Sequence, residues 1–480
     1  MENWLSKRVA NTPDRIAVYY QNQSWTFAEI QTKILFFASQ IQAEINSEKR
    51  IGLVLYNNLA GYLAIMAAQQ LGLELVLLNR RLSAVELNDQ IKDAGLQLVL
   101  TDGGYQEDLA VHKQLNFKDL PTTGLAEVEP VAEFPNDDTT SIMYTSGTTS
   151  RPKGVCQTFG NHFYSAMSSA LNLGLSADDC WLVAVPIFHI SGFSILMRHL
   201  IYGAAVVLEE RFDAQLINQR LVDLPVTHMS VVPVMLQDML ADLQPGQHYN
   251  KHFRAMLVGG GPSKENTLRE AQAHGVPVVQ CYGMTETSSQ VVALDPEYAL
   301  DKIGSVGKPL FSVELRLGKP GSAQQQAGDV WIKTPNLTKG YLNQPHLLAE
   351  KMQAGWFQTG DYGHFDEEGF LYIDGRSGDM ISSGGENIFP DEVENALADQ
   401  LVRQDFAVVG QADEHWGAVP ALVLTEPVDL AALLAVGRQR LAHYKLPKHF
   451  YLTASLPKTA SGKIKRSAIA QNLANYKELS

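Results

Sequence analysis

Residues 144–154 read YTSGTTSRPKG, and this stretch says most about the fold and chemistry of the chain. An apolar, strand-like run precedes it and a helical pattern follows it. Small hydroxyl residues beside glycine let the backbone approach phosphate oxygens closely, and Lys153 adds a cation. The Walker pattern does not fit, because no Gly-Lys-Ser/Thr follows a glycine at the required offset. Composition alone favours a solvated loop, whereas the order of the residues is typical of a phosphate-binding loop.

Short apolar runs alternate with amphipathic stretches of helical length on both sides of this loop. We expect strands at 50–55, 75–78, 98–100, 183–185, 205–208, 229–232 and 256–258. We expect helices at 58–72, 84–94, 161–173 and 262–274. This alternation predicts an α/β fold with parallel-rich sheets covered by helices. Closely spaced short strands over 304–374 predict a small β-barrel or meander, and a compact α+β segment follows. The predicted domains are 1–378 and 379–480.

The composition limits the class of protein. The chain has 480 residues, 45% apolar and 19% charged, which is ordinary for a globular enzyme of more than one domain. A net charge of -14 argues against a nucleic-acid or anionic-membrane surface. Three cysteines without a CxxC pair give neither a disulfide framework nor a zinc signature. The polar start and the lack of an apolar stretch of roughly 20 residues predict no transmembrane helix and a cytoplasmic location.

The loop resembles the phosphate loop of the superfamily of acyl- and aryl-CoA synthetases, luciferases and peptide-synthetase adenylation domains. This chain has Ser150 where the usual loop has glycine, which still permits a mobile loop. The superfamily's other motifs follow in the expected order: VGGGP at 258–262, QCYGMTET at 280–287, TGD at 359–361, DGR at 374–376 and PKTASGKI at 457–464. The resemblance therefore covers nearly the whole chain.

This resemblance implies a binding site for ATP and Mg²⁺. The residues implied to bind the nucleotide are Thr145, Ser146, Gly147, Thr148, Thr149, Lys153, Gly260, Gly261, Tyr282, Gly283, Asp361 and Arg376. Within this set, Tyr282 would offer a flat face to adenine, and Asp361 and Arg376 would contact the ribose. Thr285 would hydrogen-bond the α-phosphate, and Glu286 would help to hold Mg²⁺, which prefers oxygen ligands.

The resemblance also assigns the C-terminal segment to catalysis and to coenzyme A. Lys463 would be the lysine that promotes adenylation, and Asp379 would be the hinge of a mobile C-terminal domain. Gly384 and Gly385 would let the backbone approach the pantetheine arm. Ser382 stands where relatives often have an aliphatic residue. The implied reaction forms an acyl-adenylate from a carboxylic acid and ATP, and then an acyl-CoA thioester.

Three strings favour one acid in particular. PIFHISGFSILMR at 186–198, YGMTETSSQ at 282–290 and SGGENIFPDEVE at 383–394 closely resemble the o-succinylbenzoate–CoA ligases of menaquinone biosynthesis. That substrate keeps a second carboxylate, which needs polar partners if it is buried. Candidate substrate residues are His189, Ser191, Arg198, Ser288, Ser289 and Gln290. Arg198 could equally form an ion pair on a helix surface, and His189 is a candidate both for catalysis and for lining the pocket.

Three alternatives stay open from the sequence. The first is a fatty-acyl or aryl-CoA ligase of other specificity. The second is a stand-alone adenylation enzyme that loads a carrier protein. The third is a catalytically inactive homologue that binds a ligand, against which the joint presence of the motif residues argues. Homo-oligomers are common among such enzymes, and the sequence does not give the oligomeric state.

Overall fold

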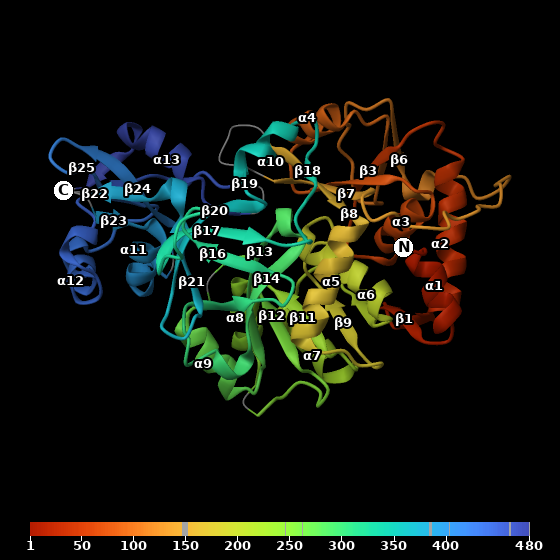
Figure 1. The fold of residues 1–480 in the computed structure, drawn as a ribbon, viewed down its shortest axis with the longest axis horizontal. Coiled ribbons are helices and arrows are strands. Elements are labelled where there is room, and N and C mark those ends of the chain that lie inside the picture. The colour runs from red at the N-terminus through yellow and green to blue at the C-terminus, as the bar shows by residue number, and fades with distance from the viewer. Residues whose placement is uncertain are drawn as a thin grey trace. The chain divides into compact units, whose positions relative to one another are not determined.

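The computed structural model describes residues 1–145, 152–244, 246–261, 263–383, 386–402, 404–459 and 462–479. The chain forms two compact units (Figure 1). Unit 1 comprises Met1–Glu314 and Lys333–Met352, and unit 2 comprises Leu315–Ile332 and Gln353–Ser480. These units interleave along the chain and are not the predicted domains 1–378 and 379–480, which stay a prediction.

One sheet of unit 1 carries the strands on either side of the phosphate loop. Its strand order is β18-β8-β7-β4-β3-β5-β6. The strands span Arg50–Val54 (β3), Glu74–Leu78 (β4), Leu98–Thr101 (β5), Lys113–Asn116 (β6), Thr139–Thr145 (β7), Lys153–Thr158 (β8) and Gly340–Tyr341 (β18). Strands β3 to β7 pair in parallel, whereas β8 and β18 are antiparallel to their neighbours. The almost wholly buried β3, β4 and β5 explain why these strands appear as continuous apolar runs in the sequence.

The second sheet of unit 1 runs in the order β15-β14-β13-β12-β11-β9-β10-β1-β2. Its strands span Ile16–Tyr20 (β1), Gln23–Thr26 (β2), Cys180–Val183 (β9), Ala205–Leu208 (β10), His228–Val231 (β11), Ala255–Val258 (β12), Val278–Met284 (β13), Ser289–Leu294 (β14) and Ser305–Pro309 (β15). The central strands β10, β9, β11, β12 and β13 are parallel, and β14 and β15 return antiparallel. The carboxyl ends of the parallel strands are where an open α/β sheet binds ligands.

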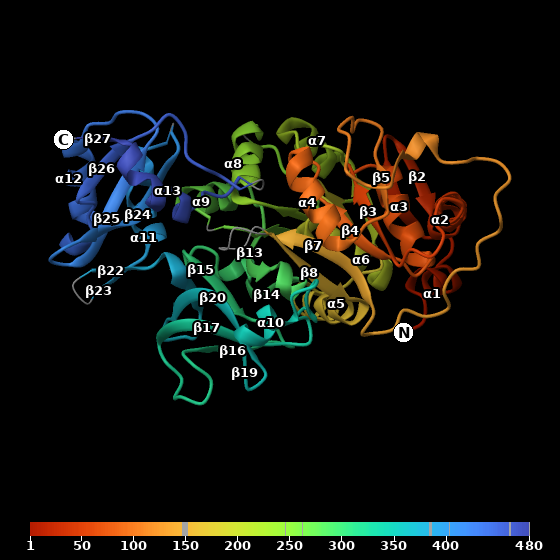
Figure 2. The same cartoon turned by 90° about the horizontal axis from the view of Figure 1, so that it is seen from above.

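Helices cover both sheets. In unit 1 they span Trp4–Asn11 (α1), Phe27–Gln42 (α2), Leu59–Gln70 (α3), Ala84–Ala94 (α4), Phe159–Leu173 (α5), Ile190–Tyr202 (α6), Ala214–Asp223 (α7), Pro233–Asp242 (α8), Glu265–Ala273 (α9) and Pro345–Lys351 (α10). Helices α3 and α4 pack against β4 (Figure 2), and α5 and α6 pack against each other and against β14. Capping boxes define two helix starts: Ser83 with Glu86 for α4, at the predicted residue, and Thr158 with Asn161 for α5, which begins two residues before the predicted start.

The predicted elements are present, most of them with bounds shifted by one or two residues. The strand expected at 183–185 is β9, which ends at Val183. The helix expected from residue 262 begins at Glu265. The phosphate loop leads into strand β8 and then into helix α5, so the predicted helical pattern does follow it, after a strand that the sequence pattern did not predict. The polar residues Lys153, Gln157 and Thr158 hid that strand from a search for apolar runs, although five of its six residues are buried.

Unit 2 contains an antiparallel run of strands and a C-terminal α+β segment. The first is ordered β16-β17-β20-β21, with Glu314–Leu317 (β16), Ala327–Lys333 (β17), Met352–Gln353 (β19), Trp356–Phe365 (β20) and Leu371–Arg376 (β21). The second has Ile381–Ser383 (β22), Glu386–Ile388 (β23), Phe406–Asp413 (β24), Gly417–Leu424 (β25), His449–Leu452 (β26) and Lys477–Leu479 (β27). Its helices are Pro390–Leu397 (α11), Leu430–Arg440 (α12) and Arg466–Asn472 (α13). The closely spaced strands predicted over 304–374 are therefore confirmed.

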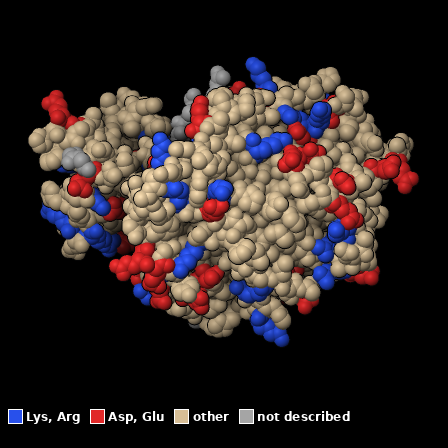
Figure 3. All heavy atoms as spheres, viewed as in Figure 1, with Lys and Arg blue, Asp and Glu red and all other residues tan. Residues whose placement is uncertain are grey.

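No helix among the described residues is long and apolar enough to cross a lipid bilayer. On the face shown in Figure 3, Lys and Arg side chains are interspersed with Asp and Glu over the described residues.

Candidate active site

The predicted phosphate loop connects two antiparallel strands. Thr145 at the end of β7 pairs with Lys153 at the start of β8, so these two strands form a hairpin. Ser146, Gly147, Thr148 and Thr149 lie outside the described residues. The hairpin base is tightly packed, since a Cβ on Gly154 would lie 3.1 Å from the Tyr144 ring.

The motif QCYGMTET forms the end of β13 and a 3-10 turn, η2 (Thr285–Thr287), which leads into β14. A Cβ on Gly283 would lie 2.1 Å from the Ser289 carbonyl oxygen, so only glycine fits where these two strands meet. Ser288 and Ser289 have φ angles of 54° and 139°, which are strained for residues with a side chain. Backbone strain of this kind often marks a functional turn.

Three residues distant in sequence hold the η2 turn in place. The Gln157 amide donates to the Thr285 carbonyl at 2.8 Å, and the Thr338 backbone N–H donates to the Glu286 carbonyl at 2.7 Å. The Tyr341 hydroxyl donates to Glu286 Oε1 at 2.9 Å. The Lys153 ammonium lies 5.8 Å from the centroid of the Tyr341 ring. The fold thus brings the predicted phosphate lysine and the predicted metal carboxylate to the same tyrosine.

The donor set fits a magnesium ion carried by a nucleotide. Among the described residues, no group of three His, Cys, Asp or Glu side chains could by itself hold a metal. Mg²⁺ commonly uses one or two carboxylates together with substrate phosphates and several waters. A single oriented carboxylate on Glu286 matches this arrangement.

The glycine motif after β12 lies at the carboxyl end of a parallel strand. Gly260 and Gly261 are exposed, and Gly260 has a φ of +86°, which favours glycine. Tyr282 is half-buried on β13, two strand positions beyond the pairing of Val258 with Gln280. The structure therefore places the predicted adenine-contacting residues at neighbouring strand ends within unit 1.

Unit 2 brings together the predicted ribose residues and the predicted catalytic lysine. Asp361 on β20 is directly opposite Arg376 on β21, with Arg376 Nε 3.0 Å from Asp361 Oδ1. Arg376 also donates to the Thr359 carbonyl at 3.2 Å. Lys463 is close enough to feel both charges: crowding by protein atoms and then the Arg376 guanidinium lower its pKa, while Asp361 opposes this. Its side chain nevertheless stays exposed to solvent.

The predicted hinge residue is tied to the segment that follows the lysine loop. Asp379 lies in a 3-10 turn (Ser377–Asp379) between β21 and β22, and its Oδ2 is 3.5 Å from Arg466 Nη1. Arg466 also pairs with Asp391 and, at 2.7 Å, with Glu394. Gly384 and Gly385 lie outside the described residues.

Three of the predicted substrate residues are in contact. Arg198 on α6 donates through Nη2 to Ser289 Oγ at 2.9 Å and to Gln290 Oε1 at 2.8 Å. Its side chain is not on a surface: Arg198 is 2% exposed, so the alternative of a surface ion pair is wrong. Among the described residues, the charges that act on the guanidinium include no carboxylate, and its buried Nε has no hydrogen-bond partner. A buried cation without an anion is costly, which indicates a place for one.

The other three predicted substrate residues lie apart from this contact. Ser288 is fully buried and donates to the Asn336 carbonyl at 3.2 Å. Ser191 is exposed at the start of α6. His189 is the N-cap residue of α6, half-buried beside the Phe188 ring. The catalytic role of His189 stays a prediction.

Sequence reasoning missed a buried polar chain that reaches the same turn. His162 on α5 donates through Nε2 to Ser141 at 3.0 Å, because Ser141 itself donates to Gln157 Oε1 at 2.7 Å. Gln157 then holds the Thr285 carbonyl. Burial, aided by the Arg198 charge, lowers the pKa of His162 to about 3, so it stays neutral. These residues stand in no motif, and their sequence carried no signal for this network.

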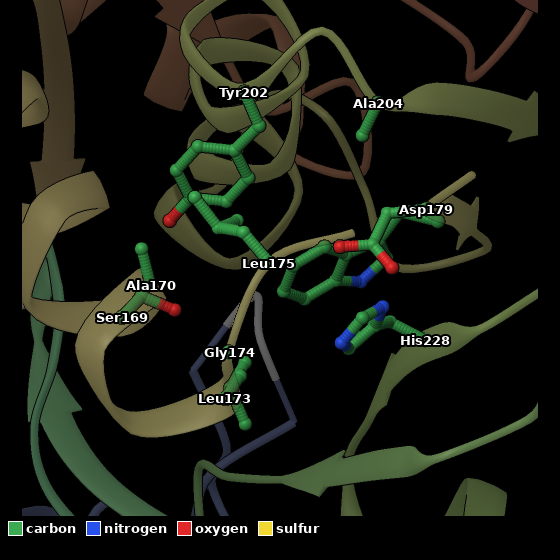
Figure 4. A pocket seen from close by; sticks show the side chains of 10 residues that line it. Ser169, Ala170, Leu173, Gly174, Leu175, Asp179, Tyr202, Ala204 and His228 are labelled. Carbon is green, nitrogen blue, oxygen red and sulfur yellow. The ribbon is translucent and has the colours of Figure 1, made fainter. Parts of the chain in front are cut away.

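Arg198 also lies over an aromatic side chain that borders a cavity. Its guanidinium is 5.3 Å from the centroid of the Trp181 ring, and Trp181 stacks on His228 with centroids 4.8 Å apart. Trp181, Tyr202 and His228 line a small cavity between α5, α6 and β11 (Figure 4). None of the predicted substrate residues lines this cavity, so it is not the predicted acyl pocket.

Comparisons with known proteins agree with this geometry. The family model described as "AMP-binding enzyme" matches residues 5–342, and the model "AMP-binding enzyme C-terminal domain" matches residues 392–463. A 2-succinylbenzoate–CoA ligase of Geobacillus sp. (strain WCH70) is 42% identical over 98% of both chains, and that of Bacillus subtilis (strain 168) is 40% identical over 97% of both.

Solved structures show the same relationship. The o-succinylbenzoate CoA synthetase from Bacillus subtilis in complex with the acyl-adenylate intermediate OSB-AMP superposes with a TM-score of 0.92, at 40% identity over 98% of both chains. The same synthetase in complex with ATP and a magnesium ion also gives 0.92, at 40% identity over 97% of this chain and 99% of that one. The predicted α/β fold is thereby confirmed. The chain belongs to the AMP-binding enzyme family.

Proposed function

We propose that the protein is an ATP-dependent 2-succinylbenzoate–CoA ligase that serves menaquinone biosynthesis. It activates its acid as an acyl-adenylate with release of pyrophosphate, and then forms the CoA thioester with release of AMP. Relatives that carry this name match along nearly the full chain at about 40% identity. The observation that carries the choice of acid is the buried Arg198 guanidinium, which lies beside the turn with Thr285 and Glu286 and lacks an anionic partner among the described residues.

The first half-reaction brings two anions together. A carboxylate oxygen of the acid forms a bond to the α-phosphorus of ATP, and the bond from that phosphorus to the pyrophosphate oxygen breaks. No general base is needed, because the attacking carboxylate is already ionised. Donors and cations that face the developing charge lower the barrier, and removal of one such group typically costs about 10²–10³ in rate. We assign this role to Lys463, Thr285 and the 145–154 loop with Lys153.

Two sets of residues hold the nucleotide in this proposal. Asp361 accepts hydrogen bonds from the ribose hydroxyls and Arg376, its cross-strand partner, fixes its orientation. Gly260, Gly261, Tyr282 and Gly283 border the adenine. Glu286 would hold Mg²⁺, which when bound neutralises charge on the phosphate oxygens. The Tyr341 hydroxyl donates to Glu286 Oε1 and so orients that carboxylate.

The acid is held through its second carboxylate. Arg198 offers donors in a buried setting where a charge-assisted pair with the benzoate carboxylate is strong. Ser289 and Gln290, already in contact with Arg198, supply the adjacent polar groups. A fatty acid has no group to neutralise this cation, which argues against the fatty-acyl alternative.

The second half-reaction transfers the acyl group to sulfur. The thiolate of coenzyme A attacks the adenylate carbonyl, a carbon–sulfur bond forms and the bond to the AMP oxygen breaks. We assign the pantetheine contact to Gly384 and Gly385, and the hinge between domains 1–378 and 379–480 to Asp379. The cytoplasmic location and the oligomeric state stay predictions.

The test is ATP–pyrophosphate exchange with 2-succinylbenzoate, benzoate and a fatty-acid series, followed by detection of the CoA thioester. We expect exchange only with 2-succinylbenzoate, and a thioester when coenzyme A is added. Exchange with a fatty or simple aryl acid instead would keep the chemistry and refute the choice of acid. Exchange with none of them would refute the enzyme assignment, and a thioester formed only on a carrier protein would favour the carrier-loading alternative.

A further inference from the structure

We propose that Tyr341 is a positioning residue that orients the Glu286 carboxylate and thereby sets how much Mg²⁺ strengthens ATP binding. This inference rests on the role proposed for Glu286. Tyr341 lies on the two-residue strand β18, whose pairing with β8 matches Tyr341 with Val155. Its hydroxyl donates to Glu286 Oε1 at 2.9 Å, and the residue is 4% exposed.

The hydroxyl can act only as a donor to this carboxylate. A phenolic O–H is a donor and a carboxylate oxygen accepts, so the Tyr341 hydroxyl is the donor in this contact. The donated bond engages one carboxylate oxygen and fixes the plane of the group. The second carboxylate oxygen of Glu286 is then held in a fixed direction. Hydrogen-bond partners that orient a metal ligand in this way raise the affinity for the metal.

The support itself is anchored on both sides. The Thr338 hydroxyl donates to the Gly340 carbonyl at 3.0 Å, and the Thr338 N–H donates to the Glu286 carbonyl at 2.7 Å. The Glu286 backbone and the strand that carries Tyr341 are therefore tied to one residue. The Lys153 ammonium, 5.8 Å from the ring centroid, places the end of the phosphate loop against the same side chain.

The chain offers a matched control on strand β7 of the same sheet. The Tyr144 hydroxyl on β7 donates to Asp93 Oδ2 at 2.6 Å. Asp93 lies on α4 and has no predicted part in the site. Tyr341→Phe and Tyr144→Phe thus remove the same chemical group from a tyrosine–carboxylate pair, and both keep the ring that packs the interior.

The experiment measures ATP affinity by calorimetry for wild type, Tyr341→Phe, Tyr144→Phe and Glu286→Gln, each in excess Mg²⁺ and in EDTA. We expect Mg²⁺ to strengthen ATP binding to wild type and to Tyr144→Phe. In Tyr341→Phe, the factor by which Mg²⁺ strengthens ATP binding should be about 10–100-fold smaller than in wild type, while the affinity for ATP in EDTA stays the same. Glu286→Gln should lose the gain as well.

Two results would overturn the inference while leaving the metal role of Glu286 intact. One is a full Mg²⁺ gain in Tyr341→Phe. The other is a loss of equal size in Mg²⁺ and in EDTA, which is the mark of a merely structural defect. If Glu286→Gln keeps the full gain, the metal assignment itself fails and the inference fails with it. The controls therefore separate the two failures.

Discussion

The buried guanidinium of Arg198 leads to a prediction in which stability and activity move in opposite directions. Its hydrogen bonds go to two neutral oxygens, on Ser289 and Gln290, and its Nε is buried without a partner. Burial of one charged group in a protein costs roughly several kcal/mol of desolvation free energy. Bonds from a charged donor return about 1.5–3 kcal/mol each. The ligand-free enzyme is therefore not much stabilised by this charge.

Replacement by methionine keeps the length of the side chain and removes the charge. Ser289 Oγ already donates to Gln290 Oε1 at 2.6 Å, so these two groups stay paired in Arg198→Met. The lost contact with Trp181 is partly replaced by a sulfur–aromatic contact of about 0.3–1.5 kcal/mol. We expect the free energy of unfolding to stay level or to rise by about 2 kcal/mol at most.

The activity should fall sharply for one acid only. Truncation of one partner of a buried, hydrogen-bonded charge pair costs about 2–5 kcal/mol. The kcat/KM for 2-succinylbenzoate should therefore drop by about 30- to 5,000-fold. The matched substrate is 4-oxo-4-phenylbutanoate, which lacks the ring carboxylate, and Arg198→Met should use it as well as wild type does.

The assays are urea unfolding of the ligand-free enzyme and initial rates of exchange with both acids. A loss of stability greater than about 2 kcal/mol together with an equal loss of rate on both acids would refute the reasoning. Arg198 would then be a structural residue. A selective loss on 2-succinylbenzoate without loss of stability has no structural explanation and would assign the carboxylate contact to Arg198.

Three further predictions address the lysine loop, the turn and the buried histidines. Lys463→Ala should abolish adenylation but spare thioester formation from supplied adenylate. Because crowding by protein atoms and the Arg376 charge lower the pKa of Lys463, the rate of ATP–pyrophosphate exchange should decline with rising pH at values below the ordinary pKa of lysine. Lys463→Arg should move that decline to higher pH. Gly283→Ala places a Cβ 2.1 Å from a carbonyl oxygen, so it should lower the free energy of unfolding by about 2–4 kcal/mol and weaken ATP binding in calorimetry. Burial lowers the histidine pKa values to about 3 for His162 and about 4 for His199 and His228, so below pH 6.5, roughly, the unfolded chain binds more protons than the folded one. Stability to urea should therefore fall as the pH drops from about 6.5 to 4, by up to about 1.4 kcal/mol per pH unit for each of the three histidines. The fall should be less steep in His162→Gln, which lacks one of them.

The sequence predicted those parts of the fold that depend on local pattern. Apolar runs gave β3, β4 and β10 because buried parallel strands have no polar face. Strand β8 was missed because its residues also suit a loop, and only pairing with β7 makes them a strand. Long-range pairing of this kind is set by tertiary contacts, which propensity does not encode.

The residues of the candidate site show the same contrast between local sequence pattern and long-range contacts. Motif order predicted Asp361 and Arg376 as nucleotide contacts, and the structure adds that they are cross-strand partners. Motif order could not point to Gln157 or Tyr341, because their partners Thr285 and Glu286 lie far from them along the chain. Residues that touch a ligand leave a motif, whereas residues that hold them act through contacts that only the folded chain makes.

Residues 285–290 join the two halves of this proposed site. Thr285 and Glu286 at one end are assigned to the nucleotide, and Ser289 and Gln290 at the other end contact the arginine assigned to the acid. Between them the chain is strained at Ser288 and Ser289, and Gln157 fixes its start. A short strained segment has few ways to move one end without the other. A poorly held ring carboxylate should therefore misplace the reacting carboxylate relative to the α-phosphate. Since misplacement of reacting groups raises the barrier itself, the Arg198→Met defect should appear in kcat as well as in KM, and an effect on KM alone would mean that the two ends act independently.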